Sequence, residues 1–175
     1  MSKVAIIGNG GGGKSTLARK LGKSLGINVH HIDKIQFKPG WKLTPQEEVA
    51  RLHGAILASQ RWIIDGWGGW ELMEKRFAAA DTIILIDLPL RLHYWWAIKR
   101  QITSGFGETP DRPENCPLLP KTWEMMKVLW MVHHQIRPQL LELIERYRPD
   151  RQVITLNSRQ SLRQFTATYC EVRPL

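Results

Sequence analysis

The sequence is short of acidic residues, of cysteine and of long apolar runs, and each shortage excludes a class of protein. Sixteen Asp and Glu stand against 25 Lys and Arg, which leaves a formal charge of +9. No apolar run reaches the roughly 18 residues of a membrane-spanning helix, so we expect no membrane partner. The two cysteines, Cys116 and Cys170, have neither CxxC nor Cys/His spacing, which disfavours a zinc site and favours reduced thiols.

The N-terminus also lacks an apolar signal-peptide core, because residues 1–7 are followed at once by glycines. We therefore predict a cytoplasmic protein. The 175 residues are 43% hydrophobic, enough for one packed domain over residues 1–175, so disorder is excluded as the main state.

The positive charge is concentrated at the N-terminus, where five basic residues precede the first acidic one, Asp33. Such a concentration suits either a polyanion such as DNA or a small phosphate-bearing substrate. The chain has no arginine-rich tract or basic tail, which favours the small substrate.

Alternating apolar runs and helical patterns predict an α/β fold. The runs at 3–7, 28–32, 61–65, 81–87 and 152–156 predict five buried strands. Helical patterns occupy residues 14–25, about 44–59, about 90–103, about 121–147 and 158–169, with Thr44 and Ser158 as expected N-caps. Strands alternating with helices imply a three-layer, parallel, doubly wound sheet with helices on both faces.

Residues 8–15 read Gly-Asn-Gly-Gly-Gly-Gly-Lys-Ser and fit the phosphate-binding motif GxxxxGK[ST], placed between a predicted strand and a predicted helix. Phosphate oxygens need several backbone N–H donors in one concavity, which side chains at residues 10–13 would obstruct. Lys14 can then reach the β- and γ-phosphates, and Ser15 can offer a hydroxyl to Mg²⁺. The expected nucleotide contacts are Gly8, Asn9, Gly10, Gly11, Gly12, Gly13, Lys14, Ser15 and Thr16.

A glycine-rich turn that binds nothing is the alternative, but four adjacent glycines are entropically costly to order and a simple turn needs only one or two. We therefore predict a P-loop NTPase fold that uses ATP and Mg²⁺. A signalling GTPase is disfavoured because the chain has no Asn-Lys-x-Asp run to recognise guanine.

Three aspartates follow predicted strands at the edge of the sheet where open α/β proteins bind ligands. Asp65 is the first candidate for Mg²⁺ or its water, because the apolar run 62–64 followed by Asp-Gly has the form of a Walker B strand. Asp33 is the candidate to orient or deprotonate the phosphate acceptor. Asp87 has either a functional role or a helix-capping role.

Three arginines flank or occupy a stretch rich in glycine and proline, residues 104–117, which predicts a mobile loop. They are Arg100, Arg112 and Arg137. Any single one can be a solvated surface residue, but we expect at least one to stabilise the charge that moves during phosphoryl transfer.

Eight tryptophans suggest base stacking, yet four lie in helical stretches among Leu and Met and are expected in the core: Trp95, Trp96, Trp123 and Trp130. Trp41 and Trp67 stand in loops near the expected acceptor cleft and are candidate substrate contacts. The adjacent pairs His30-His31 and His133-His134 are expected to point apart, which disfavours metal chelation.

The chain resembles the nucleoside-monophosphate-kinase-like branch of P-loop proteins, and more closely the small bacterial adenylate-kinase-like proteins known as DNA topology modulation proteins. The resemblance extends over nearly the full length. It rests on Gly8 to Thr16, His31-Ile-Asp33, Lys38-Pro-Gly-Trp41, Ile63-Ile-Asp-Gly66, Arg76 before Ala80-Asp81, Leu85-Ile-Asp-Leu-Pro89, Lys99-Arg100, Cys116-Pro117 and Arg137-Pro138.

The resemblance implies a five-stranded sheet, an acceptor-binding segment at residues 34–59 and a lid at residues 104–121 that closes over ATP. It also implies that Arg76 binds the acceptor and that Arg100 contacts the transferring phosphate.

Two positions depart from the family pattern: Trp67 stands where asparagine is expected, and Trp96 where relatives often have another arginine. Two functions remain open. One is an ATP- and Mg²⁺-dependent phosphotransferase acting on a small acceptor such as a nucleotide or nucleoside. The other is a nucleotide-dependent regulatory protein that binds DNA and has no small-molecule kinase activity.

Overall fold

Five parallel strands and the helices between them make up a computed structural model that describes the backbone of residues 1–104 and 122–170, with side chains for residues 1–99 and 123–170. The main elements are β1 (Lys3–Gly8), α1 (Lys14–Leu25), β2 (Val29–His31), α2 (Ile32–Gln36), α3 (Gln46–Ala58), β5 (Trp62–Asp65), α4 (Trp70–Ala79), β6 (Thr82–Ile86), α5 (Leu90–Ser104), α6 (Thr122–Met131), α7 (Arg137–Tyr147), β7 (Gln152–Leu156) and α8 (Arg159–Cys170). None of the helices within the described ranges combines the length and the apolar character that a bilayer crossing needs.

The strand order of the main sheet is β2-β5-β1-β6-β7, and every pairing within it is parallel. This confirms the predicted five-stranded parallel sheet. In the central strand, Val4 lies opposite Ile63 of β5 on one side and Thr82 of β6 on the other. The strand that carries the glycine-rich motif therefore has a neighbour on each side, which fixes its carboxyl end in place.

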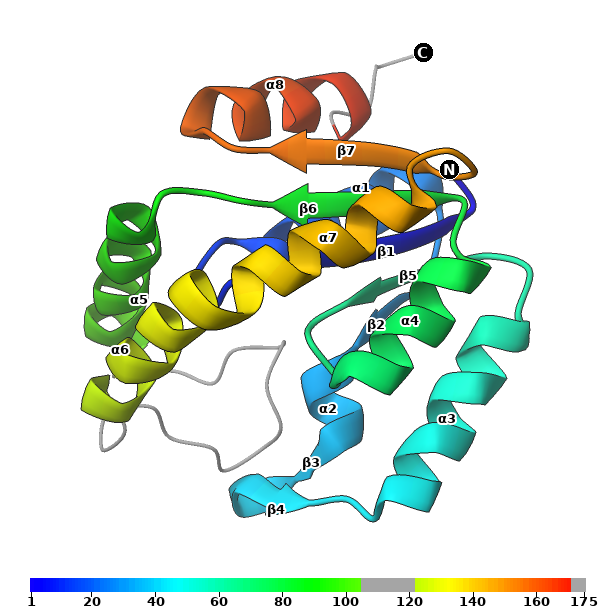
Figure 1. Ribbon diagram of the computed structural model, residues 1–175, viewed down its shortest axis with the longest axis horizontal. Helices are drawn as coiled ribbons and strands as arrows, with labels where there is room; N and C mark the ends of the chain where they lie inside the picture. The colour runs from blue at the N-terminus through cyan, green and yellow to red at the C-terminus, as the bar shows by residue number, and fades with distance from the viewer. Residues whose placement is uncertain (105–121, 171–175) are drawn as a thin grey trace.

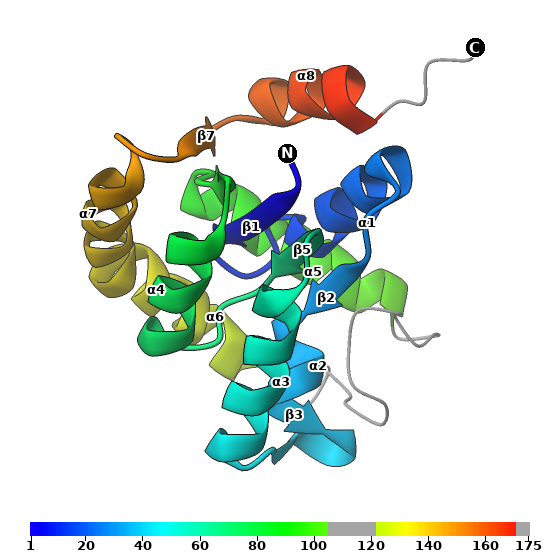
Figure 2. The same cartoon turned by 90° about the vertical axis from the view of Figure 1, so that its right-hand side faces the viewer.

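Alternate residues of each strand enter two separate cores, one on each face of the sheet. Val4 and Ile6 pack in a core with residues of α1 and α8, whereas Ala5 and Ile7 pack in a core with residues of α4 and α7. Figure 2 shows α4 and α7 on one side of the strands and α1 on the other. The two buried faces confirm the three-layer arrangement.

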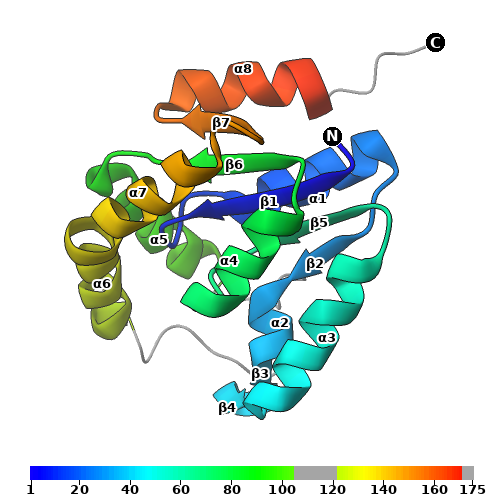
Figure 3. The same cartoon turned by 45° about the vertical axis from the view of Figure 1, so that its right-hand side comes forward.

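The carboxyl ends of the strands all point toward the side where α5 and α6 lie (Figures 1 and 3). At the far edge, α2 leads into a short hairpin of β3 (Phe37–Lys38) and β4 (Lys42–Leu43), joined by the 3₁₀ turn η1 (Pro39–Trp41). The glycine-rich turn after β1, residues 8–15 and hereafter the P-loop, therefore lies between α5 and α6 on one side and α2 with the β3–β4 hairpin on the other.

Helix α4 has no counterpart among the predicted elements. Its buried side chains, Met73, Arg76 and Phe77, have helical spacing, but one of the three is charged. A buried arginine hides the apolar periodicity from which a helix is recognised. The predicted N-cap of α3 is also wrong: Pro45 occupies that position without a side-chain cap, and Thr44 instead donates its backbone N–H to the carbonyl of Gln36, 2.9 Å away.

The single helix predicted over residues 121–147 is interrupted by a π-helical turn, η3 (Val132–Ile136), between α6 and α7. Pro138 lacks an N–H and cannot continue the regular ladder, which accounts for the break. Within the turn the rings of His133 and His134 lie 5.2 Å apart, edge to face, so the expectation that this pair points apart is wrong.

Candidate functional site

The glycine-rich turn after β1 adopts a backbone that other residues rarely tolerate, with φ of +68° at Gly11 and +82° at Gly13. Gly13 is also the N-cap of α1, and it has no side chain with which to cap that helix. The first-turn N–H groups of α1 therefore lie at the turn with no acceptor supplied by the N-cap residue. The predicted nucleotide contacts, residues 8–16, form one continuous strand, turn and helix start.

Polar contacts tie the turn to its own lysine and to α6. The Lys14 ammonium donates to the carbonyl of Asn9 at 2.8 Å. The amide of Asn9 donates to the carbonyl of Leu129 at 2.8 Å, and its side-chain oxygen accepts from the N–H of Gly10 at 2.7 Å. Because both ends of the Asn9 side chain are hydrogen-bonded, this side chain fixes the path of the turn.

Helices α5 and α6 also explain three of the glycines. A Cβ atom on Gly10 would lie 2.8 Å from a methyl group of Leu129, and one on Gly11 would lie 2.9 Å from the carbonyl oxygen of His93. On Gly12 it would lie 2.9 Å from the imidazole of His93. Close packing on the outside of the turn therefore favours glycine, most strictly at Gly11, where the neighbouring atom belongs to the backbone. This reason is separate from access for phosphate and cannot be read from the sequence.

Asp65, at the end of β5, lies beside the start of α1. The hydroxyl of Ser15 donates to one carboxylate oxygen at 2.7 Å, and Nδ1 of His31 donates to the other. Asp65 is 2% exposed. His31 was missed as a site residue, and the only sequence signal for it was its position at the end of a predicted strand.

The pair of Ser15 and Asp65 fits Mg²⁺, since this ion takes one or two protein oxygens and completes its shell with phosphate and water. Within the described ranges, no group of three or more His, Cys, Asp or Glu side chains is arranged around a common metal position.

Asp33 lies in the first turn of α2 and is exposed. One of its carboxylate oxygens is 3.6 Å from the position that a Cβ atom would take on Gly66, the residue directly after Asp65. Folding thus brings two of the three strand-end aspartates to the same short turn, residues 66–69. Three glycines of this turn have φ between +81° and +109°.

Arg76 is completely buried behind that turn, and its Nη2 donates to the carbonyl of Trp67 at 2.9 Å. Its Nε and Nη1 have no hydrogen-bond partner among the described residues. Burial lowers the pKa of Arg76 to about 10, while the Asp65 carboxylate acts in the opposite direction. Burial, with the nearby charge of Arg76, also lowers the pKa of His53 in α3 to about 4.

The two tryptophans predicted to contact substrate lie in different surroundings. Trp67 is half-buried and packs edge to face on Trp70, with ring centroids 5.4 Å apart. Trp41 packs in the same manner on Phe37 in the β3–β4 hairpin, at 5.3 Å. The predicted acceptor segment, residues 34–59, also lines a groove of about 650 Å³ along the free edge of β2.

Asp87, three residues before α5, pairs with an arginine of α7. Its carboxylate accepts two hydrogen bonds from the guanidinium of Arg137, at 2.6 and 2.7 Å, and this pairing raises the pKa of Arg137. The sequence suggested neither this partner nor this role. The side chain of Arg100, on α5, and the whole of Arg112, with residues 105–121 of the predicted lid, lie outside the described residues.

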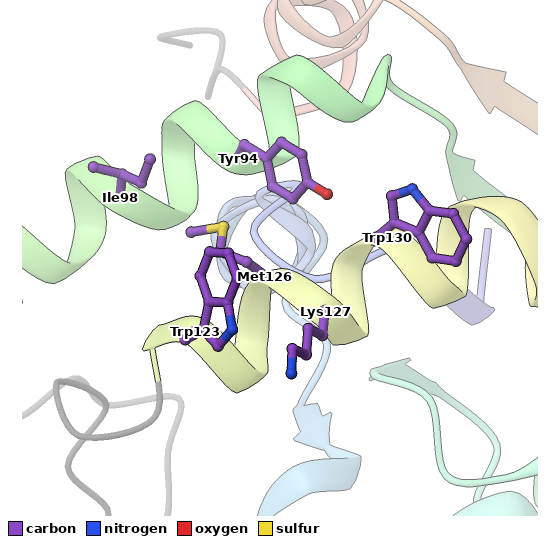
Figure 4. Close-up of a pocket in the computed structure, with 6 residues that line it drawn as sticks. All are labelled: Tyr94, Ile98, Trp123, Met126, Lys127 and Trp130. Carbon is purple, nitrogen blue, oxygen red and sulfur yellow. The ribbon is translucent and has the colours of Figure 1, made fainter.

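Three of the four helical tryptophans are not core residues. Trp95, Trp123 and Trp130 are 58%, 71% and 49% exposed, because α5 and α6 extend beyond the carboxyl edge of the sheet and only one face of each reaches it. Figure 4 shows part of the outer surface, an apolar groove of about 450 Å³ between the two helices. It is lined by Tyr94, Ile98, Trp123, Met126, Lys127 and Trp130.

Trp96, the fourth, packs against the core that contains α1 and α8, and it approaches the P-loop. Its ring is 3.8 Å from the position of a Cβ atom on Gly13, and the guanidinium of Arg159 lies over the ring at 5.7 Å. A pocket of about 270 Å³ opens here, lined by Trp95, Trp96, Lys99, Arg159, Leu162 and Arg163.

No protein-family model matches the chain, and no curated protein matches it in sequence. Solved structures do match its fold. A shikimate kinase from Acinetobacter baumannii in complex with shikimate superposes with a TM-score of 0.57 at 14% identity, covering 96% of this chain and 93% of that one. A gluconokinase from Sinorhizobium meliloti 1021 gives 0.50 at 12% identity, with coverage of 97% and 89%.

A shikimate kinase from Bacteroides thetaiotaomicron gives a TM-score of 0.50 at 15% identity, covering 94% of this chain and 96% of that one. At these identities the likeness concerns the fold alone. The chain therefore has the fold of the P-loop kinases, in which a five-stranded parallel sheet carries the glycine-rich turn at the end of its central strand.

Proposed function

We propose that this protein is an ATP- and Mg²⁺-dependent phosphotransferase that moves the γ-phosphate of ATP to a hydroxyl group of a small acceptor. The observation that carries the proposal is the 2.7 Å hydrogen bond from Ser15 to Asp65, which joins the P-loop helix to the adjacent strand end. In P-loop NTPases a hydroxyl and a carboxylate at these two places hold the metal ion. The shared fold with kinases of small molecules supports the same function.

At the phosphate end, the backbone N–H groups of residues 11–13 would donate to phosphate oxygens. Lys14 would exchange the Asn9 carbonyl for the β- and γ-phosphates. Ser15 and Asp65 would hold Mg²⁺, which neutralises phosphate charge when bound. Lys14 and the amides would then stabilise the charge that spreads over the transferring group.

At the acceptor end, Asp33 would accept the proton of the attacking hydroxyl. The acceptor oxygen forms a bond to the γ-phosphorus while the bond from phosphorus to the bridging oxygen breaks, which leaves ADP. We propose a nucleotide or nucleoside as the acceptor class, following the family resemblance. The residues proposed to contact or support the acceptor and the moving phosphate are Trp41, Trp67, Arg76, Arg100, Arg112 and Arg137.

We propose that the purine base of ATP binds in the pocket beside Trp96. The pocket lies next to Gly13, at the end of the P-loop, and it is lined by the indole ring of Trp96 and by the cations of Lys99 and Arg159. Aromatic rings and guanidinium groups both stack on nucleobases.

A coupled assay of ADP release tests the proposal, with nucleoside monophosphates, nucleosides and small sugar acids as acceptors. We expect turnover with at least one acceptor. We expect Lys14→Ala to lower it by about a thousandfold, because the ammonium stabilises transition-state charge. Lys20→Ala is the matched control, since Lys20 is exposed on the same helix. Turnover that survives the loss of Lys14 would refute its role.

The DNA-binding alternative rests on the charge of +9 and the family resemblance. It would replace the kinase proposal if duplex DNA bound at physiological ionic strength with a steep salt dependence while every acceptor remained unphosphorylated.

A further inference from the structure

His93 is buried on α5 against the outer side of the P-loop, 1% exposed. Its Nδ1 lies 2.8 Å from the carbonyl oxygen of Gly10, 83 residues earlier in the chain. A carbonyl oxygen only accepts, so Nδ1 carries the proton and the imidazole donates. The imidazole also fills the space beside Gly12, where a Cβ atom would come within 3.3 Å of Nδ1.

This hydrogen bond fixes the orientation of one P-loop peptide. All described peptide bonds are trans, so the carbonyl of Gly10 and the N–H of Gly11 point in opposite directions. Because His93 holds the carbonyl toward α5, the N–H of Gly11 points away from His93. The peptide between Asn9 and Gly10 has other partners. The Asn9 carbonyl accepts from Lys14, and the N–H of Gly10 donates to the side chain of Asn9.

The surroundings of His93 favour the neutral form of its imidazole. Burial lowers its pKa from the ordinary value, and the charges of Lys14 on α1 and His133 on η3 act in the same direction, whereas the carbonyls of Gly10 and Leu88 oppose them. A neutral imidazole protonated on Nδ1 has one N–H to donate, and Gly10 takes it.

Helix α5 has two different faces at this point. His93 and Ala97 border the P-loop glycines, whereas Tyr94 and Ile98 face the groove toward α6 (Figure 4). Neighbouring residues of one helix thus offer a test position and a control position.

We propose that His93 is a positioning residue for triphosphate binding, which aims the amide of Gly11 at the phosphates by holding the carbonyl of Gly10. The proposal rests on the nucleotide binding proposed above. His93 itself does not touch the phosphates in this proposal. Without its N–H, the peptide between Gly10 and Gly11 is free to rotate, and one donor of the phosphate site is lost.

The test compares His93→Asn with His93→Leu in the full chain. Asn places an N–H donor close to the position of Nδ1, and Leu has almost the same shape without a donor. Calorimetry with inorganic tripolyphosphate, and with ATP in the presence of Mg²⁺, should show about fivefold weaker binding for His93→Leu, the effect of one hydrogen bond. His93→Asn should stay within about twofold of the wild-type affinity. Tyr94→Leu is the control and should bind as the wild type does.

A purely structural role for His93 makes a different prediction, because binding would then follow thermal stability. We expect the melting temperatures of the Asn and Leu variants to be similar while their phosphate affinities differ. Equal affinities for the two variants would overturn the proposal. A wild-type protein that binds neither probe would overturn the proposed nucleotide binding, and this inference with it.

Discussion

Two glycine-rich turns lie side by side at the carboxyl edge of the sheet, and each is held by a buried side chain from a later helix. The P-loop follows β1, and His93 holds its Gly10 carbonyl. The turn at residues 66–69 follows the neighbouring strand β5, and Arg76 holds its Trp67 carbonyl. Glycine permits the bend in both turns, but a distant side chain selects which way one peptide faces.

The two supports differ in charge. Burial favours the neutral form of the His93 imidazole, and its hydrogen bond to the Gly10 carbonyl offsets the cost of burying the ring. The guanidinium of Arg76 is a buried cation with two nitrogens that have no partner among the described residues, and it depends on the nearby Asp65. The P-loop is therefore held by shape and hydrogen bonding, and the second turn by electrostatics as well.

The largest expected effect is that of Asp65→Asn, because Asp65 accepts a hydrogen bond from Ser15 beside the first turn and its charge favours the buried cation of Arg76 behind the second. We expect turnover to fall by about a thousandfold, as for loss of a metal-holding or charge-stabilising group. The coupled assay measures this well below the melting temperature. Asp81→Asn, at the opposite end of the sheet, is the control and should change stability without changing turnover. Equal losses of activity in the two variants would contradict a specific role for Asp65 at the two turns.

Trp96→Ala tests whether the nucleotide site extends from the P-loop into the pocket beside Trp96. Loss of a stacking surface should weaken ATP binding by about tenfold and leave tripolyphosphate binding unchanged. Calorimetry with the two ligands separates the base from the phosphates. Trp123→Ala is the matched control on exposed α6. An equal loss for tripolyphosphate would place Trp96 in support of the P-loop and not of the base.

Arg76→Met should weaken binding of the acceptor and spare ATP, whereas His93→Leu should weaken binding of ATP. Without the hydrogen bond to the Trp67 carbonyl, the turn beside Asp33 loosens, and we expect the KM for the acceptor to rise about fivefold while ATP affinity stays constant. Lys75→Met changes the neighbouring exposed cation and serves as control. A parallel loss of ATP affinity in Arg76→Met would show that the two turns are not independent.

The last prediction concerns stability and not activity, through His53, whose pKa of about 4 in the folded protein lies below the ordinary 6.5 because the residue is buried. Between these values the unfolded chain binds more protons, so stability should fall as pH drops from 6.5 to 4, by at most about 1.4 kcal/mol per pH unit. Urea unfolding of His53→Phe should show a shallower pH dependence than the wild type. An unchanged slope would mean that burial and the nearby charge of Arg76 do not lower the pKa of His53 in the folded protein.

The sequence was sufficient for the five strands and for the turn of the P-loop, because continuous apolar runs and glycine spacing are patterns of a few neighbouring residues. It was insufficient for α4, where buried Arg76 interrupts the apolar pattern, and for the break before Arg137. It was also misleading for Trp95, Trp123 and Trp130, since a helical apolar stripe does not reveal whether another element covers it.

What the sequence by itself determined is therefore local: which segments become strands, where the backbone must bend sharply, and which aspartates follow strands. Only the tertiary structure decided the partners of those groups. His31 meets Asp65 across 34 residues, Arg137 meets Asp87 across 50, and His93 meets Gly10 across 83. Such contacts depend on the order of strands in the sheet and on the helices that cross its carboxyl edge, and neither leaves a periodic signal in the chain.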